Sequence, residues 1–255
     1  MGELYHLNVG CADASVIITS TATFLIDCYG IDQYGHLLPA TKQIRGVFIT
    51  HQHSDHYAGL AYLRDNGYSI GCLIYSPYER RYGDNSVTIE EWNEFNSLKE
   101  FFRKKGTSLY APLRQADFSK PYWETDGVKF WMIGPFEHLT TSSTCELHDA
   151  CLIITAQLGI RNCLFTGDAS DSSLQCVTTN TTGFCGDILH ASHHGSLNGA
   201  DLEFIKKCNA KYTVISTESG VYENVPHPTA LKRYNDHTTE RVFRTDIDGS
   251  VKSTF

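Results

Sequence analysis

The sequence predicts an α/β protein in which two mixed β-sheets lie face to face with helices on their outer sides. Two observations point to this fold class. Short apolar segments, several with a two-residue period, alternate with segments of helical period, and strands followed by helices occur twice in the 255 residues. No repeat, low-complexity tract or linker rich in glycine, serine or proline interrupts this order. We therefore expect a single domain over residues 1–255.

The first sheet is expected in the N-terminal part of the chain. Its strands are the apolar segments 4–9, 16–20, 23–28, 44–50 and 72–75. A short helix is expected over residues 58–66, ended by Gly67. Thr88 and Glu91 have the spacing of a capping box, which predicts a longer helix from there to about Lys105.

A second sheet is expected to begin near Leu109. Its strands are the segments 128–133, 151–158 and 162–166, followed by 187–190 and 212–216. Helices are expected around residues 201–208 and after Pro228, and strands at 241–244 and 251–254 close the fold.

The composition bears on the binding partners and the cellular location of the protein. Its formal charge of −8 argues against broad attraction to polyanions, although a bound pair of divalent cations would add about four positive charges locally. No segment approaches the ~20 consecutive apolar residues that span a bilayer, and the first residues lack the layout of a signal peptide. The nine cysteines contain no Cys-x-x-Cys pair and lie mostly in apolar runs, as reduced thiols do. We expect a cytoplasmic protein that does not bind a membrane.

Four side chains that can bind metal occur within six residues, directly after the apolar segment 46–50. They are His51, His53, Asp55 and His56. Histidines at positions i and i+2 of a strand end can point at one ion, and the Asp and His carried round the next turn can meet a second ion about 3.5–4 Å away. The alternative, a solvated polar loop, does not account for this crowding.

Two ions that leave a position open for water need about seven protein ligands, so three more have to come from elsewhere. Asp168 follows an apolar strand and could bridge both ions, or instead cap a helix. His227 lies between two prolines before a helix, where the alternative is an exposed turn. His148 is preferred to His138 as the last ligand, because the strand that follows it leads into the one ending at Asp168.

Together these residues resemble the metallo-β-lactamase superfamily over essentially the whole chain. Within it, the chain looks most like the metallo-β-lactamase domain of ComEC-type competence proteins. Four further stretches carry this likeness: Leu7-Asn8-Val9-Gly10-Cys11-Ala12-Asp13-Ala14 before Phe24-Leu25-Ile26-Asp27, Leu164-Phe165-Thr166-Gly167-Asp168, His193-His194-Gly195-Ser196, and Arg244-Thr245-Asp246 near Gly249. The chain differs from the competence type at His53, where those proteins commonly have Asp, and near His148, where they have an Asn-rich stretch. It also lacks their membrane channel, so DNA transport is not implied.

The resemblance implies a four-layer αββα metallo-β-lactamase sandwich with two metal ions. It places His51, His53 and His148 on one ion, Asp55, His56 and His227 on the other, and Asp168 between them. An imidazole-rich ligand set favours Zn²⁺, with Mn²⁺ as the alternative at the carboxylate-containing site.

Catalytic roles are expected for residues at the same edge of the fold. Asp55 would orient the attacking water and shuttle its proton. Of the neighbouring histidines, His194 is expected to be catalytic and His193 to contact substrate, with the alternative that one of them braces a metal ligand. Because adjacent side chains rarely face one pocket, we expect one histidine to point in and the other out. Ser196 is expected either to contact substrate or to cap the following helix.

The leading functional hypothesis is a phosphodiesterase or nuclease that acts on DNA, RNA or a nucleotide, which the resemblance favours. A carboxylic ester, thioester or lactone hydrolase would use the same ligands but a more apolar pocket. A non-catalytic metal- or partner-binding protein is the third hypothesis, and it is disfavoured because no ligand position is missing. An oxygen-reducing di-iron role is disfavoured because related proteins with that role tend to have Glu where His53 stands.

Overall fold

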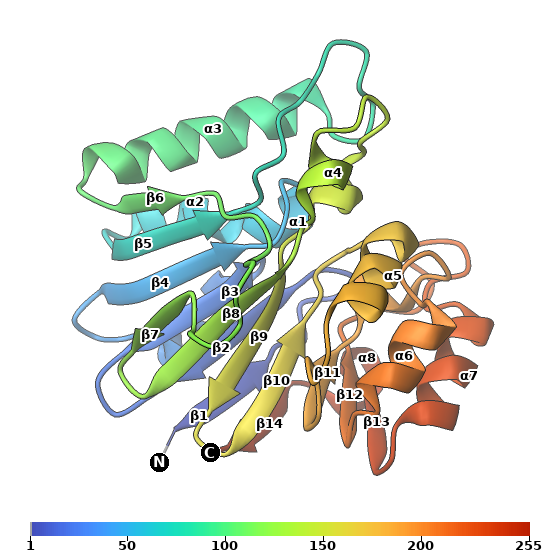
Figure 1. Ribbon diagram of the computed structural model, residues 1–255. Helices are drawn as coiled ribbons and strands as arrows, with labels where there is room; N and C mark the ends of the chain where they lie inside the picture. The colour runs from blue at the N-terminus through green and yellow to red at the C-terminus, as the bar shows by residue number, and fades with distance from the viewer. Residues whose placement is uncertain (1) are drawn as a thin grey trace.

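Two seven-stranded mixed sheets pack face to face in the computed structural model, which describes residues 2–255 (Figure 1). The first sheet has the order β14-β1-β2-β3-β4-β5-β6. Its strands are β1 (Glu3–His6), β2 (Ala14–Ile18), β3 (Thr23–Cys28), β4 (Gln43–Ile49), β5 (Ser69–Tyr75), β6 (Ser108–Tyr110) and β14 (Val251–Thr254). Strands β14 to β3 pair antiparallel, and strands β3 to β6 pair parallel.

The second sheet repeats this division into a parallel and an antiparallel half. Its order is β13-β12-β11-β10-β9-β8-β7. The strands are β7 (Trp123–Thr125), β8 (Val128–Gly134), β9 (Ile153–Leu158), β10 (Arg161–Phe165), β11 (Ile188–His190), β12 (Tyr212–Ile215) and β13 (Arg241–Arg244). Strands β10 to β13 are parallel and strands β7 to β10 antiparallel.

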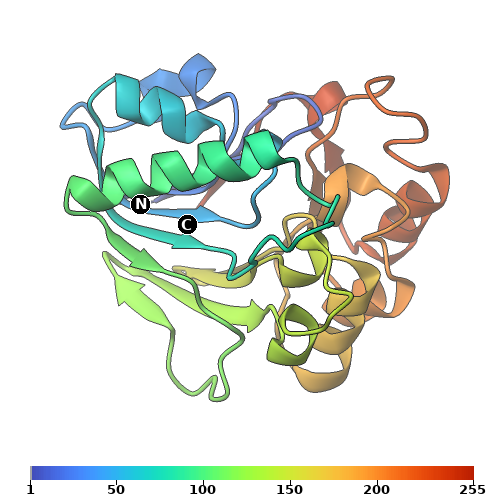
Figure 2. The same ribbon diagram turned by 90° about the horizontal axis from the view of Figure 1, so that it is seen from above.

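Helices cover the outer face of each sheet (Figure 2). The first sheet carries η1 (Ile31–Leu37), α1 (Ser54–Tyr57), α2 (Gly59–Asp65) and α3 (Ile89–Lys104), and the second carries α5 (Asp171–Asn180), α6 (Leu202–Cys208) and α7 (Pro228–His237). The short helices α4 (Glu137–Thr140), η2 (Leu147–Ala150), η3 (Ser192–Gly195) and α8 (Thr245–Asp248) lie in connections between these elements. No helix among residues 2–255 has the length and apolar character that crossing a membrane requires.

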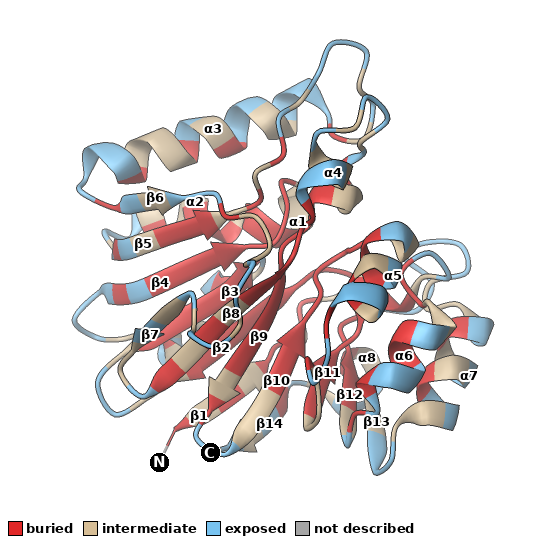
Figure 3. Ribbon diagram, viewed as in Figure 1, coloured by how far each residue is buried: buried red, intermediate tan, exposed pale blue. Residues whose placement is uncertain are grey.

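Three apolar clusters lie between the four layers of structure, and the central strands are buried along most of their length (Figure 3). Between the sheets, Phe24 and Phe48 of the first sheet pack with Phe130 and Phe165 of the second, and all four are fully buried. A second layer joins the first sheet to α2 and α3, and a third joins the second sheet to α5, α6 and α7. Burial on both faces explains why the later parts of the central parallel strands, such as Val47–Ile49 of β4 and Cys163–Phe165 of β10, are apolar. The four-layer αββα sandwich expected from the sequence is confirmed.

The predicted capping box starts α3. The Thr88 hydroxyl accepts a hydrogen bond from the backbone N–H of Glu91, and the Glu91 carboxylate accepts one from the backbone N–H of Thr88. The helix buries Phe95, Leu98 and Phe102 against the first sheet. This helix lies over the loop after β4, because the hydroxyl of Tyr57 in α1 donates to the backbone carbonyl of Glu91.

Two expectations about connectivity are wrong. The strand near Leu109, β6, does not open the second sheet but pairs in parallel with β5 at the edge of the first. The cysteines are not all reduced, because Cys185, in the segment before β11, forms a disulfide with Cys208 at the end of α6. The other seven cysteines are free thiols.

The parallel halves of the two sheets end at the same edge of the sandwich. The loops that follow β3 and β4 leave the first sheet there, and the loops that follow β10, β11 and β12 leave the second. In sheets with parallel strands, ligands bind beyond the carboxyl ends of the strands. The residues of these loops therefore define the candidate site.

Candidate metal centre

The segment after β4 presents its histidines to this edge in a fixed orientation. His51 is fully buried, and His53 donates a hydrogen bond from Nε2 to the backbone carbonyl of Ser86, 2.6 Å away. That bond leaves Nδ1 of His53 with a lone pair directed at Nε2 of His51, which is 3.0 Å away. Two imidazole nitrogens at this distance repel each other unless a proton or a cation lies near both.

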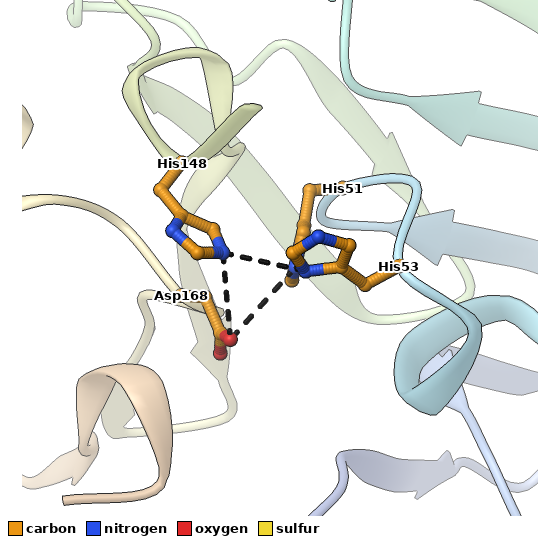
Figure 4. A group of neighbouring side chains, drawn as sticks. All are labelled: His51, His53, His148 and Asp168. Atoms are coloured by element: carbon orange, nitrogen blue, oxygen red, sulfur yellow. Dashed lines mark hydrogen bonds and ion pairs between the residues drawn. The ribbon is translucent and has the colours of Figure 1, made fainter. Parts of the chain in front are cut away.

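His148 and Asp168 complete a first cluster with these two histidines (Figure 4). Nε2 of His148 lies 3.3 Å from Nδ1 of His53. Oδ2 of Asp168 lies 3.8 Å from Nε2 of His51 and 4.0 Å from Nε2 of His148. Four ligand atoms around a tetrahedral ion with bonds of about 2.1 Å are about 3.4 Å apart. The cluster therefore has the chemistry and the spacing of a metal site.

A second cluster consists of Asp55, His56 and His194. It adjoins the first through Asp168, whose Oδ1 lies 3.3 Å from Nε2 of His56 and whose Oδ2 lies 3.6 Å from Nε2 of His194. Oδ2 of Asp55 is 3.5 Å from Nε2 of His194. Of the second cluster and Asp168, three buried atoms have no hydrogen-bond partner within residues 2–255: His56 Nε2, His194 Nε2 and Asp168 Oδ1. Buried polar atoms are almost always paired, so these atoms fit ligands of a second cation.

Buried carboxylates and carbonyls fix the rings of the second cluster. Nδ1 of His56 donates to Oδ2 of Asp27 at 2.8 Å, and Asp27 also accepts from the backbone N–H and the hydroxyl of Thr50. Nδ1 of His194 donates to the backbone carbonyl of Ser216 at 3.1 Å. Each of these bonds leaves the Nε2 atom of the ring as the potential metal ligand. Asp13, 2% exposed, lies behind both histidines.

Without metal, burial and the neighbouring charges shift the pKa values of the clustered side chains. Burial lowers the pKa of His148 to about 3 and that of His51 well below its usual value. Burial alone would lower the pKa of His194, but Asp168 and Asp55 raise it to about 9. Burial would also raise the pKa of Asp168, but His194 and His56 hold it well below its usual value. The carboxylate between the clusters is thus ionised and needs positive charge on both sides.

His193 and His194 both face the same cavity, which corrects the expectation that one would point away. The cavity has a volume of about 220 Å³ and is lined by both rings together with Asp55 and Asp168. Both histidines have the left-handed backbone conformation, with φ of 52° and 53°. Strained backbone of this kind is characteristic of functional sites. Nδ1 of His193 donates to the carbonyl of Asn198, and its Nε2 lies 3.7 Å from Asp168.

Three residues proposed from the sequence lie outside both clusters. His227 is the N-cap of α7, where its Nδ1 accepts from the backbone N–H of Thr229. Ser196 ends η3, and neither it nor His227 lines the cavity. His138, the alternative to His148, lies on α4 beside Cys176. His194 occupies the position in the second cluster that the resemblance gives to His227.

Sequence reasoning missed the supporting carboxylates Asp13 and Asp27. Both belong to the stretches that carry the resemblance, and Asp27 is the next-to-last residue of β3, whose other residues are uncharged. A charged residue near the end of a buried strand is unusual, and this was the signal that could have indicated the role of Asp27.

Comparisons with known proteins agree with this geometry. The sequence pattern of the metallo-beta-lactamase superfamily matches residues 9–217. No curated protein sequence matches the chain. The metallo-beta-lactamase fold protein YhfI from Bacillus subtilis is 14% identical, with a TM-score of 0.60 over 99% of this chain and 100% of that one. CmlA, a diiron β-hydroxylase from Streptomyces venezuelae, is 14% identical, with a TM-score of 0.59 over 100% of this chain and 54% of that one.

A diphosphatase from the PhnP family is also similar, with 16% identity and a TM-score of 0.50 over 100% of this chain and 98% of that one. At these identities the structural likeness concerns the fold alone. The family match, the four-layer sandwich and the two ligand clusters at its edge agree with one another. The chain belongs to the metallo-beta-lactamase superfamily.

Proposed function

We propose that the chain is a dinuclear metal-dependent hydrolase that cleaves a phosphodiester. The observation that carries this proposal is the buried Asp168 carboxylate, which lies between two clusters of imidazole and carboxylate groups with unpartnered atoms. In this proposal His51, His53 and His148 hold one ion, Asp55, His56 and His194 hold the other, and Asp168 reaches both. His227 has no part in it. The imidazole-rich set favours Zn²⁺, and Mn²⁺ is the alternative.

Two divalent cations held in this way supply an activated water near neutral pH and neutralise charge on the reacting phosphate. The side chains around them have their own tasks. Asp55, with 28% of its side chain exposed, lines the cavity and would orient the attacking water and accept its proton. His193 donates to Asn198 through Nδ1, so that a proton on Nε2 makes it a donor to the leaving oxygen.

Three considerations support a phosphodiester as substrate. A pair of cations suits in-line displacement at phosphorus, where both the attacking and the leaving oxygen gain charge. The sequence His193-His194-Gly195-Ser196 resembles that of ComEC-type domains, and a diphosphatase shares the fold. A carbon ester, thioester or lactone is the second candidate, because Tyr222 and Val225 give the cavity an apolar side.

The test is metal analysis followed by parallel assays on the same preparation. The protein loaded with Zn²⁺ or Mn²⁺ is expected to hydrolyse bis-p-nitrophenyl phosphate, and Asp168→Asn is expected to lose most of this activity and bound metal. Asp236→Asn is the matched control, because Asp236 pairs with Lys232 on the exposed face of α7. Hydrolysis of only carbon esters, thioesters or lactones would contradict the phosphodiester assignment. Absence of tight divalent binding would contradict the whole proposal.

A further inference from the structure

A groove leads away from the cavity of the candidate metal centre. Its volume is about 480 Å³, and it shares Cys11, His53, Asp55 and Tyr222 with the cavity. Its far wall is formed by Gly10 and by residues of the loop after β12. A substrate whose scissile bond lies in the cavity would therefore place a neighbouring part of the molecule in this groove.

The charge of the groove is negative. Its lining contains the carboxylates of Asp55, Glu91 and Glu218 and no lysine or arginine. The oxygens of Glu91 already accept hydrogen bonds from Ser54 and Thr88. Glu218, in contrast, has no hydrogen bond or ion pair from its side chain to any residue of the described range 2–255. It is also absent from every cluster there that could hold a metal ion. Its charge is available to a ligand.

The carboxylate of Glu218 lies against the backbone of Gly10. A Cβ atom at Gly10 would lie 2.8 Å from Oε2 of Glu218, and φ at Gly10 is +82°. The absence of a side chain therefore lets this carboxylate lie directly on the loop that forms the groove wall. A second groove, of about 530 Å³, shares Gly10 and Glu218, so that the carboxylate lies between two hollows.

Two aromatic side chains add to this arrangement. Tyr29 is 37% exposed and Tyr222 is 54% exposed, and both line the groove. Burial and the charge of Asp55 raise the pKa of Tyr222, which agrees with its place between cavity and groove. Aromatic faces beside a carboxylate form the usual protein environment of a quaternary or primary ammonium group.

We propose that this groove binds a positively charged ammonium group on the alcohol part of the substrate, with Glu218, Tyr29 and Tyr222 as its recognition residues. The inference rests on the proposed function and narrows it. A polynucleotide would place a second phosphate beside the carboxylates of Glu91 and Glu218, where like charges repel. The preferred substrate is therefore a small phosphodiester with a cationic alcohol, and not a nucleic acid.

A pair of esters of equal shape tests the proposal on the metal-loaded protein. p-Nitrophenyl phosphocholine carries a trimethylammonium group, and p-nitrophenyl 3,3-dimethylbutyl phosphate has a neutral carbon in its place. The choline ester is expected to have the higher kcat/KM. Glu218→Gln is expected to reduce the ratio of the two kcat/KM values by up to about fivefold, as for an exposed ion pair. Because both esters are measured on one sample, incompletely folded protein affects both rates equally.

Matched variants separate charge and aromatic contributions from general effects. Glu240→Gln changes an exposed glutamate that does not line the groove, and is expected to leave the ratio unchanged. Tyr29→Phe retains the aromatic face and the ratio, whereas Tyr29→Leu lowers it. Hydrolysis of both esters with a ratio near one, or a ratio insensitive to Glu218→Gln, would overturn the proposal and leave the phosphodiesterase assignment intact.

Equilibrium binding covers the case in which neither ester is cleaved, which would count against the proposed function alone. Choline and 3,3-dimethylbutanol are then titrated into the metal-loaded protein and followed by NMR. The groove proposal predicts that choline binds more tightly and that Glu218→Gln abolishes the difference. Equal binding of the two alcohols would overturn it.

Discussion

Asp27→Asn is expected to weaken metal binding without unfolding the protein. Asp27 is 2% exposed, and its carboxylate accepts from His56 Nδ1 at 2.8 Å and from the backbone and hydroxyl of Thr50 at 2.8 and 2.7 Å. Asparagine tolerates the same left-handed backbone, with φ of 52° here, and its oxygen can still accept from the backbone of Thr50. Its amide group, however, would face Nδ1 of His56 as a second donor.

The magnitude follows from that conflict. To avoid two facing donors, His56 has to move its proton to Nε2, the atom that has no partner in the second cluster. Loss of a carboxylate that orients a ligating histidine lowers metal affinity by about 10- to 100-fold, or about 1.4–2.7 kcal/mol. Binding at the second site is therefore expected to weaken by this factor, while the first cluster, which Asp27 does not contact, retains its ion.

The assay is titration with Zn²⁺ against a chromogenic chelator, with metal content measured after gel filtration. Asp126→Asn is the matched control, because Asp126 has φ of 50° but lies in an exposed ion pair with Arg45. The control is expected to bind two ions with the affinity of the parent protein. If Asp27→Asn also binds two ions with the affinity of the parent protein, the reasoning is refuted.

Other perturbations test the backbone, the ligand set and the charge of the site. Gly167→Ala would place a Cβ atom 2.5 Å from the Thr50 hydroxyl at φ of +47°. Chemical denaturation should therefore show that the free energy of unfolding falls by about 2–4 kcal/mol. Gly183→Ala, where φ is also positive and no atom lies within 4 Å, should lower it by about 1 kcal/mol. His227→Ala should retain both ions and lose only a helix cap, about 0.5–2 kcal/mol, whereas His194→Ala should bind one ion fewer by metal analysis. In metal-free protein the pKa of His194 is raised to about 9, so its stabilising contribution is complete below pH 6.5 and is lost as the pH rises through 9. Denaturation of the His194→Asn variant at pH 6.5 and 9.5 should show a smaller difference than in the parent, and an equal difference would contradict this assignment.

Most of the strands and helices could be predicted from local patterns in the sequence. A short apolar run located strands such as β3 (Thr23–Cys28), and the Thr88–Glu91 spacing located the start of α3 to the residue. These signals are strong because a short apolar run and a helix cap are both made by neighbours in the chain. Sheet membership depends on distant partners, so the short strand β6 was assigned to the second sheet although it pairs with β5 in the first.

In the candidate site, too, the sequence indicates the residues that lie close together in the chain but not those whose role depends on distant partners. The crowded loop His51–His56 could be recognised because four side chains that can bind metal lie within six residues, and the end of an apolar strand indicated Asp168. The choice between His194 and His227 could not be made locally. It depends on the left-handed backbone of His194 and on its bond to the carbonyl of Ser216, 22 residues away. The Cys185–Cys208 pairing is likewise non-local, because its partners have a sequence separation of 23.

The two clusters draw on both sheets at once. His51, His53, Asp55 and His56 leave the first sheet after β4, whereas His148, Asp168 and His194 belong to the second. Ions bound there would have ligands from both sheets and would stabilise the packing of one sheet on the other. At a thousandfold excess over its dissociation constant, one such ion adds about 4 kcal/mol to the free energy of unfolding. Cation supply would then govern how long the protein survives proteolysis, in addition to how fast it turns over substrate.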